Sequence, residues 1–171
     1  QRMLKELIVK YDIKAKDHPN IIKLYDTLRA DNSKDVYLVF EFMEADLHNV
    51  ISEDILKDVH IRFIIYQMTK ALKYLHTGFI IHRDLKPSNI LVNSNCTIKL
   101  CDFGLVRSIS SKNDSSPILT EGVASAGIGP LGFIGFKMLL TPADIWSFGC
   151  IIYEIIAQKP LFAGNSTLDQ L

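Results

Sequence analysis

Residues 82–89 read HRDLKPSN, and residues 102–104 read DFG after a short apolar stretch. The first run sets a carboxylate, Asp84, two positions before Lys86 and five before Asn89, and the second run adds Asp102. A carboxylate that accepts a proton, a cation and two oxygen ligands form a set suited to chemistry on a phosphate held by Mg²⁺. A lone DFG recurs by chance, but both runs in this order and spacing are hard to obtain by accident.

The residues around both runs predict rigid elements that hold these loops in place. The β-prone runs 90–92 and 98–100 are joined by a polar turn, so the two motifs flank a small hairpin. Upstream, apolar residues recur on one face of a long helix, with Gly78 just past its end as a C-cap. These residues are Ile64, Met68, Ala71, Leu72 and Leu75.

Three further elements follow from the apolar pattern. Helical spacing over 3–10 predicts an amphipathic helix, and the β-prone runs 21–28 and 36–40 predict a hairpin. After Pro142 comes a helix that is apolar on most sides and must therefore be buried. Its apolar residues are Ile145, Trp146, Phe148, Ile151, Ile152, Ile155 and Ile156.

The composition limits the class of protein. The 171 residues are 48% hydrophobic and 22% charged, which is typical of one globular domain. The 19 basic and 19 acidic residues balance, so nothing indicates nucleic acid or an anionic membrane as a partner. The longest apolar stretch, 145–157, is interrupted by Glu154 and is too short to span a bilayer. Three cysteines without C-x-x-C spacing favour a reducing, intracellular compartment.

Several stretches beyond the two motifs make the chain resemble the eukaryotic protein kinases, and among them the mitogen-activated protein (MAP) kinases. These are HPNII at 18–22, YLVFEFMEADL at 37–47 and TE at 120–121. FEFME at 40–44 and CTIKLC at 96–101 are most similar to the atypical extracellular-signal-regulated branch. The resemblance runs over 1–123 and resumes over 141–171. It implies an α+β fold, the two-lobe protein-kinase fold in truncated form, with 1–43 as small-lobe remainder and hinge and 44–171 as a partial large lobe.

The resemblance also implies catalytic and metal-binding roles for matching residues. Asp84 matches the base that accepts the proton of the attacking hydroxyl, and Lys86 matches the lysine that neutralises the moving γ-phosphate. Glu6 matches the helix glutamate that pairs with the phosphate-holding lysine. Asn89 and Asp102 match the two Mg²⁺ ligands.

Four residues match the walls of the family's ATP site. Phe40 corresponds to the gatekeeper behind the hinge, and Leu91 corresponds to the floor of the adenine slot. Glu41 and Met43 correspond to the hinge, whose backbone groups bind adenine.

Three residues match the family's regulatory and supporting positions. Arg83 would hold a phosphorylated Thr120 through a bidentate pair, and Asp144 resembles the buried aspartate that braces the catalytic loop. The resemblance thus implies a serine/threonine kinase that uses ATP and Mg²⁺. Its substrates would be proteins, phosphorylated on a Ser or Thr that is followed by proline. It further implies an upstream activating kinase and an intracellular location. That location is the cytoplasm, and the nucleus is a second possibility.

Some of these residues also have a plainer interpretation. An isolated Asp84 would be a helix cap or turn residue, and Glu6 would be a solvated carboxylate on a helix face. A strand that contains Phe40, Phe42 and Met43 would be plain core. The remaining histidines have no ligand spacing and are interpreted as caps or surface residues: His18, His48, His60 and His76.

Departures from the family pattern leave a rival function open. No Gly-rich loop and no lysine in a V-A-x-K context accompanies Glu6, and Gly122 stands where the family has a tyrosine. No helices follow to cover the apolar helix after Pro142, so one of its faces should be exposed. The chain is therefore interpreted as a fragment of a larger protein. The rival is a catalytically inactive kinase-like fragment that acts only as a binding module.

Residues 126–131 suggest another alternative, an artefact of the gene model. The family run Arg-Trp-Tyr-Arg-Ala-Pro can be written CGC TGG TAT AGG GCC CCT, with a following G. Without its first base it reads Ala-Gly-Ile-Gly-Pro-Leu, which is the sequence of 126–131. The next position does not fit, because a Glu codon would not give Gly132. Segment 122–140 is therefore either real or the product of a frameshift, and resequencing the transcript decides between them.

Overall fold

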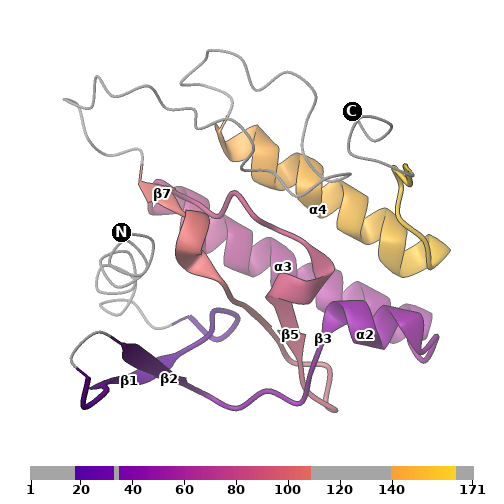
Figure 1. Ribbon diagram of the computed structural model, residues 1–171. Helices are drawn as coiled ribbons and strands as arrows, with labels where there is room; N and C mark the ends of the chain where they lie inside the picture. The colour runs from indigo at the N-terminus through magenta and orange to yellow at the C-terminus, as the bar shows by residue number, and fades with distance from the viewer. Residues whose placement is uncertain (1–17, 33–34, 109–139, 165–171) are drawn as a thin grey trace.

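The computed structural model describes residues 18–32, 35–108 and 140–164, shown in colour in Figure 1. The described strands are β1 (Leu24–Arg29), β2 (Val36–Phe40), β3 (Ala45–Asp46), β4 (Ile80–Ile81), β5 (Ile90–Val92), β6 (Ile98–Leu100) and β7 (Arg107–Ser108). The helices are α2 (Leu47–Ser52), α3 (Asp58–Thr77) and α4 (Leu140–Ala157), with short 3₁₀ turns η1 (Pro87–Asn89) and η2 (Phe103–Leu105). Small sheets and helices together confirm the predicted α+β class.

The predicted hairpin over 21–40 is present as β1 and β2. The two strands pair antiparallel, with Arg29 opposite Val36 and Leu24 opposite Phe40, and the register shifts between Leu24 and Asp26. Such an irregularity bends a strand and increases its twist. The hairpin projects away from the helices at one end of the molecule (Figure 1). Strand β2 leads from it directly into the segment that precedes β3.

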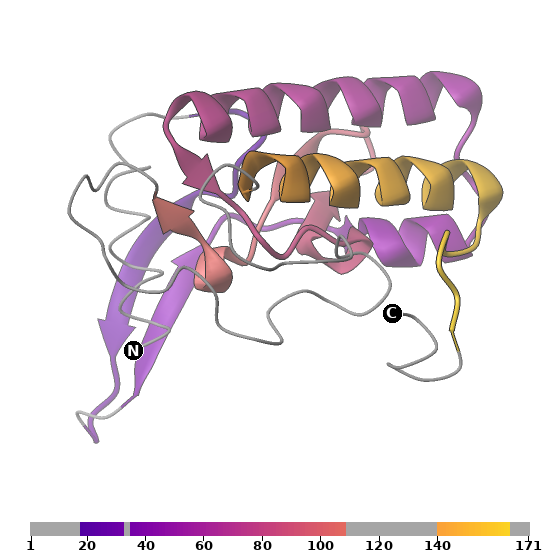
Figure 2. The same ribbon diagram turned by 90° about the horizontal axis from the view of Figure 1, so that it is seen from above.

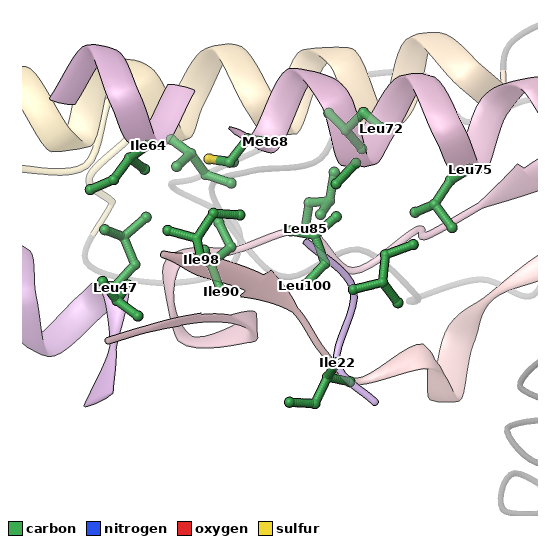
Figure 3. Packing of buried hydrophobic residues seen from close by; sticks show 14 of the residues in the cluster. Ile22, Leu47, Ile64, Met68, Leu72, Leu75, Leu85, Ile90, Ile98 and Leu100 are labelled. Atoms are coloured by element: carbon green, nitrogen blue, oxygen red, sulfur yellow. The ribbon is translucent and has the colours of Figure 1, made fainter. Parts of the chain in front are cut away.

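The second predicted hairpin is also confirmed, as β5 and β6, and it packs against α3. Strand β5 pairs antiparallel with β6 on one side and with β3 on the other. Ile90, Val92, Ile98 and Leu100 are buried on the face that meets α3. Figure 3 shows Ile90, Ile98 and Leu100 opposite the apolar face of α3, whose Ile64, Met68, Leu72 and Leu75 are likewise buried. Each fully buried side chain of this size stabilises the fold by about 1.5–3 kcal/mol relative to an exposed one.

Helix α3 begins and ends where local hydrogen bonding changes. At its start His60 N–H donates to the Lys57 carbonyl at 2.8 Å, and Lys57 N–H donates to His60 Nδ1 at 3.2 Å. At its end Gly78 is the C-cap, as predicted, and its N–H donates to the Leu75 carbonyl at 3.0 Å. Gly78 itself has φ −84°, however, and the left-handed conformation belongs to Phe79, at φ 56°. The glycine therefore caps the helix without supplying the reversal of the chain.

Helix α4 lies beside α3, and both views show the two helices side by side (Figure 2). It begins at Leu140, so Pro142 lies in its first turn, where the missing N–H costs little. Ile151 and Ile155 are buried against the rest of the fold. The prediction that this helix is buried on most sides is wrong for the opposite face, where Ile145, Trp146 and Ile156 are 52%, 41% and 64% exposed. That exposure agrees with the separate expectation that one face of the helix is exposed.

Across the described residues, no helix is both long and apolar enough to cross a membrane. The predicted helix over 3–10 lies outside the described residues, as do residues 122–139 of the segment 122–140, Glu6 and Thr120.

Candidate active site

The HRDLKPSN run forms the connection between β4 and β5, and buried residues in its middle fix it to the core. Leu85 joins the hydrophobic core, and Pro87 is buried at the start of η1. Arg83 has φ 69°, a left-handed conformation that costs a non-glycine residue about 1 kcal/mol or more. The loop is therefore rigid and slightly strained, which is common where side chains must be displayed in a fixed direction.

Three of the predicted site residues meet in this loop. Lys86 Nζ lies 3.1 Å from Asp84 Oδ2, and Asn89 Nδ2 donates to the same oxygen at 3.1 Å and to the Asp84 carbonyl at 2.8 Å. Asp84 and Asn89 are only 5% and 6% exposed, whereas the Lys86 side chain is 31% exposed. The carboxylate is thus oriented from two sides by donors, and charge-assisted contacts of this kind are stronger than neutral ones.

A buried carboxylate on α4 fixes the backbone of the same loop. Asp144 is 1% exposed, and its two oxygens accept the backbone N–H groups of His82 and Arg83, each at 2.9 Å. His76 Nε2, from the last turn of α3, lies 2.8 Å from Asp144 Oδ2. The prediction that His76 is only a cap or surface residue is therefore wrong, because its ring contacts this buried carboxylate. No local spacing signals the contact, since 68 residues separate the two.

His82 is fully buried behind the loop and is held as a neutral ring. Its Nε2–H donates to the Cys101 carbonyl at 2.9 Å, while Nδ1 accepts from the Asp84 N–H at 3.4 Å. The Phe103 ring packs against it, with 5.0 Å between ring centroids. Burial lowers the pKa of His82 below 6.5, and the neighbouring Asp144 carboxylate and Cys101 hydrogen bond oppose only part of that effect.

The lowered pKa of His82 predicts that stability falls in mild acid. Below about pH 6.5 the unfolded chain binds a proton that the folded chain refuses, so the unfolding free energy should fall as pH drops. The slope from one such histidine is at most about 1.4 kcal/mol per pH unit. Denaturant unfolding of the full-length protein at pH 7.5, 6.5 and 5.5, followed by circular dichroism, measures it. His82→Gln should show a shallower loss, and an equal slope in both proteins would contradict the prediction.

Asp102 lies at the end of β6, next to the catalytic loop. The Cys101 N–H donates to the Asn89 carbonyl at 2.9 Å, so the chain brings Asp102 alongside Asn89. Asp102 has φ 57° and ψ 70°, and its Oδ1 accepts from Gly104 N–H at 3.3 Å. Phe103 is buried, which anchors the DFG run in the core. A non-glycine residue in the left-handed region signals that the surroundings hold this carboxylate in place.

The donor set of Asn89 and Asp102 fits a Mg²⁺ ion. Because Asn89 Nδ2 is used by Asp84, its side-chain oxygen faces away, and no hydrogen bond to that oxygen is found among the described residues. No three His, Cys, Asp or Glu side chains in the described part of the chain gather as a metal site by themselves. Magnesium typically takes one or two protein oxygens and completes its shell with water and phosphate. The two residues therefore suit a metal that arrives together with a phosphorylated ligand.

The predicted hinge residues follow β2 and lie next to the β5–β6 hairpin. Phe40, Met43 and Leu91 are partly buried and pack against the core, while Phe42 between them is 83% exposed. Within the part of the chain that the structure describes, the Glu41 carbonyl and both backbone groups of Met43 have no hydrogen-bond partner. An unpaired donor and two acceptors in a row are what the edge of a flat heterocycle would bind.

The comparisons with known proteins match this arrangement. The family model for the protein kinase domain matches residues 1–171. Extracellular signal-regulated kinase 2 of Dictyostelium discoideum is 46% identical over 175 residues, covering 100% of this chain and 47% of that protein. Mitogen-activated protein kinase 15 of Caenorhabditis elegans is 50% identical over 161 residues, 90% of this chain and 34% of that protein. Extracellular signal-regulated kinase 7 of Drosophila melanogaster is 46% identical over 178 residues, covering 100% of this chain and 19% of that protein. The chain spans less than half the length of each of these relatives.

Proposed function

The chain belongs to the protein kinase family, and on that premise we propose that the protein transfers the γ-phosphate of ATP to Ser and Thr hydroxyl groups of other proteins. The three relatives named above, at 46–50% identity, are named extracellular signal-regulated kinases 2 and 7 and mitogen-activated protein kinase 15. The observation that carries the proposal is the Asp84–Lys86–Asn89 cluster, in which one oriented carboxylate and one cation converge on a rigid loop.

Asp84 acts as the base in this proposal. Its carboxylate accepts the proton of the attacking Ser or Thr hydroxyl while the new oxygen–phosphorus bond forms and the bond to the leaving ADP oxygen breaks. The Asn89 amide keeps Asp84 Oδ2 in one orientation, 3.1 Å away. Lys86, which is partly exposed beside the carboxylate, neutralises charge on the phosphoryl oxygens during transfer. Positioning and electrostatic stabilisation thus provide most of the rate enhancement.

Asn89 and Asp102 would hold Mg²⁺, which neutralises the charge of the phosphates when bound. The adenine would lie against Leu91 and Phe40, with its edge on the Glu41 carbonyl and the Met43 backbone groups. Glu6, outside the described residues, would pair with a phosphate-holding lysine of the small lobe. In this proposal residues 1–43 form the end of the small lobe and the hinge, and residues 44–171 form part of the large lobe.

Regulation and partners are also proposed. Thr120 lies outside the described residues, and its phosphorylation by an upstream kinase would add about −2 of charge, which Arg83 would bind. The substrates would be intracellular proteins with Ser or Thr before proline. Asp144 and His76 would support this machinery by holding the backbone at His82 and Arg83.

A phosphotransfer assay tests the proposal. Full-length protein, purified after co-expression with an activating kinase, is incubated with radiolabelled ATP, Mg²⁺ and a general acceptor protein. Label should appear on Ser and Thr in phosphoamino-acid analysis and should be lost when EDTA removes the metal. Label on Tyr alone would contradict the proposed specificity, and a fully phosphorylated protein without activity would favour the rival, an inactive binding module.

A further inference from the structure

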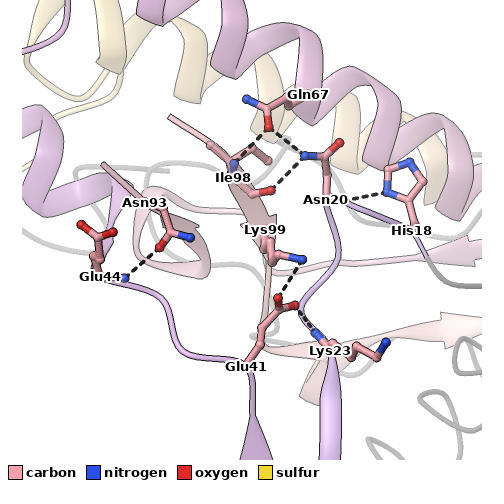
Figure 4. Close-up of polar contacts among 9 residues, drawn as sticks. All are labelled: His18, Asn20, Lys23, Glu41, Glu44, Gln67, Asn93, Ile98 and Lys99. Carbon is pink, nitrogen blue, oxygen red and sulfur yellow. Dashed lines mark hydrogen bonds and ion pairs between the residues drawn. The ribbon is translucent and has the colours of Figure 1, made fainter. Parts of the chain in front are cut away.

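Glu41 contacts Lys99 in β6 and Lys23, the residue before β1 (Figure 4). Its Oε2 lies 2.9 Å from Lys99 Nζ, in β6, and both side chains are only 16% exposed. Its Oε1 accepts from the backbone N–H of Lys23 at 2.6 Å, and its own N–H donates to the Lys23 carbonyl at 3.0 Å. Lys23 immediately precedes β1. One carboxylate therefore ties the hinge both to β6 and to the start of the β1–β2 hairpin.

Lys99 stands on the same face of the β5–β6 hairpin as Leu91. The two residues are direct partners in the antiparallel register, and directly opposed residues point to the same side of a sheet. The neighbouring pair, Ile90 and Leu100, faces the opposite side and is buried in the core. The ammonium group that holds Glu41 is thus placed beside the proposed floor of the adenine slot.

We infer that Glu41 and Lys99 form a positioning ion pair that fixes the hinge relative to Leu91 and thereby preorganises the slot for ATP. This inference rests on the proposed function, in which the backbone at Glu41 and Met43 binds the adenine edge and Leu91 forms the floor. Because the pair joins Glu41 to Lys99, the cross-strand partner of Leu91, the separation of these two walls is set before the nucleotide arrives. A site that is already ordered loses less conformational freedom on binding and so binds more tightly.

The remaining contacts explain why loss of the pair should affect binding and not the fold. The segment before β1 stays attached to β6 by two backbone hydrogen bonds, Ile22 N–H to Leu100 O and Leu100 N–H to Asn20 O, both at 2.9 Å. Asn20 Nδ2 also donates to the Ile98 carbonyl at 3.0 Å and to Gln67 Oε1 at 2.9 Å (Figure 4). These bonds do not involve Glu41. When the ion pair is broken, the hinge keeps its backbone hydrogen bond to Lys23 and loses only its side-chain link to β6.

Two single variants of the full-length protein test the inference. Lys99→Met keeps the side-chain length without the charge, and Glu41→Gln keeps an oxygen for the Lys23 N–H. Each should raise the calorimetric Kd for Mg²⁺ with a non-hydrolysable ATP analogue, and the KM for ATP, about threefold to tenfold. The kcat and the KM for the protein substrate should stay within twofold, because the catalytic loop is untouched.

The double variant and the controls decide between a specific and a general effect. If the two residues act through each other, the double variant Glu41→Gln, Lys99→Met has a Kd for the ATP analogue no higher than that of the single variant with the higher Kd. Lys99→Arg, which restores the pair, and Lys73→Met, which removes an exposed lysine of α3, should bind as wild type. Additive losses, or single variants with unchanged Kd, overturn the inference. Wild-type protein that binds no ATP analogue overturns the proposed function itself, and the inference with it.

Discussion

Replacing Asp84 with asparagine in the full-length protein should lower kcat by about 10²–10⁴-fold, the usual contribution of a positioned general base. Asparagine has nearly the same shape, so the contacts from Asn89 and Lys86 constrain the side chain in the same place. An amide, however, cannot take the proton of the attacking hydroxyl at neutral pH. The Kd for ATP should change little, because in the proposed mechanism Asp84 acts on the attacking hydroxyl and the adenine is held by other residues. Steady-state kinetics with saturating ATP and calorimetric nucleotide binding measure both quantities.

A matched control separates the loss of the base from the general effect of removing one carboxylate from the protein. Asp31 is exposed in the turn after β1, and Asp31→Asn removes the same charge far from the loop. That variant should retain wild-type kcat and the same thermal midpoint. If Asp84→Asn kept more than a tenth of wild-type turnover, the assignment of Asp84 as the base would be wrong.

The parts of the fold that could be predicted are those in which neighbours in sequence decide the structure. The β5–β6 hairpin followed from two apolar runs and a polar turn, and α3 followed from the spacing of its apolar residues. The cluster of Asp84, Lys86 and Asn89 could be expected because all three lie within one short loop. In each case a local pattern contains the information.

The parts that could not be predicted are contacts between distant elements. His76 and Asp144 are 68 residues apart, and neither has a spacing that points to the other. The Glu41–Lys99 ion pair likewise depends on the position of the hinge next to β6. The order of charged residues in the sequence does not predict that position. Helix α4 illustrates a third limit: apolar residues on most sides cannot tell which face the fold covers, so the exposure of Ile145 and Ile156 appears only in three dimensions.

A polypeptide of residues 1–171 alone should incorporate no measurable phosphate. The Gly-rich loop and the lysine partner that the family places before Glu6 are not among these residues, and such preorganised contacts are each worth several kcal/mol of transition-state stabilisation. The exposed apolar face of α4 should also make this polypeptide aggregate, since Ile145, Trp146 and Ile156 leave large apolar side chains exposed on one helix. Two independent defects thus act on the same sample, one on chemistry and one on solubility.

The experiment must separate those two defects, because an aggregated sample is inactive for a trivial reason. Ile156→Lys places a charge on the exposed face of α4, away from Asp144, and should keep the polypeptide of residues 1–171 in solution. That soluble version is assayed with radiolabelled ATP, Mg²⁺ and a general acceptor protein, beside the full-length protein carrying the same substitution. We expect activity only in the full-length protein. Incorporation by the short polypeptide that disappears with Asp84→Asn would contradict the prediction, since it would show that the described loop catalyses transfer without the missing phosphate contacts.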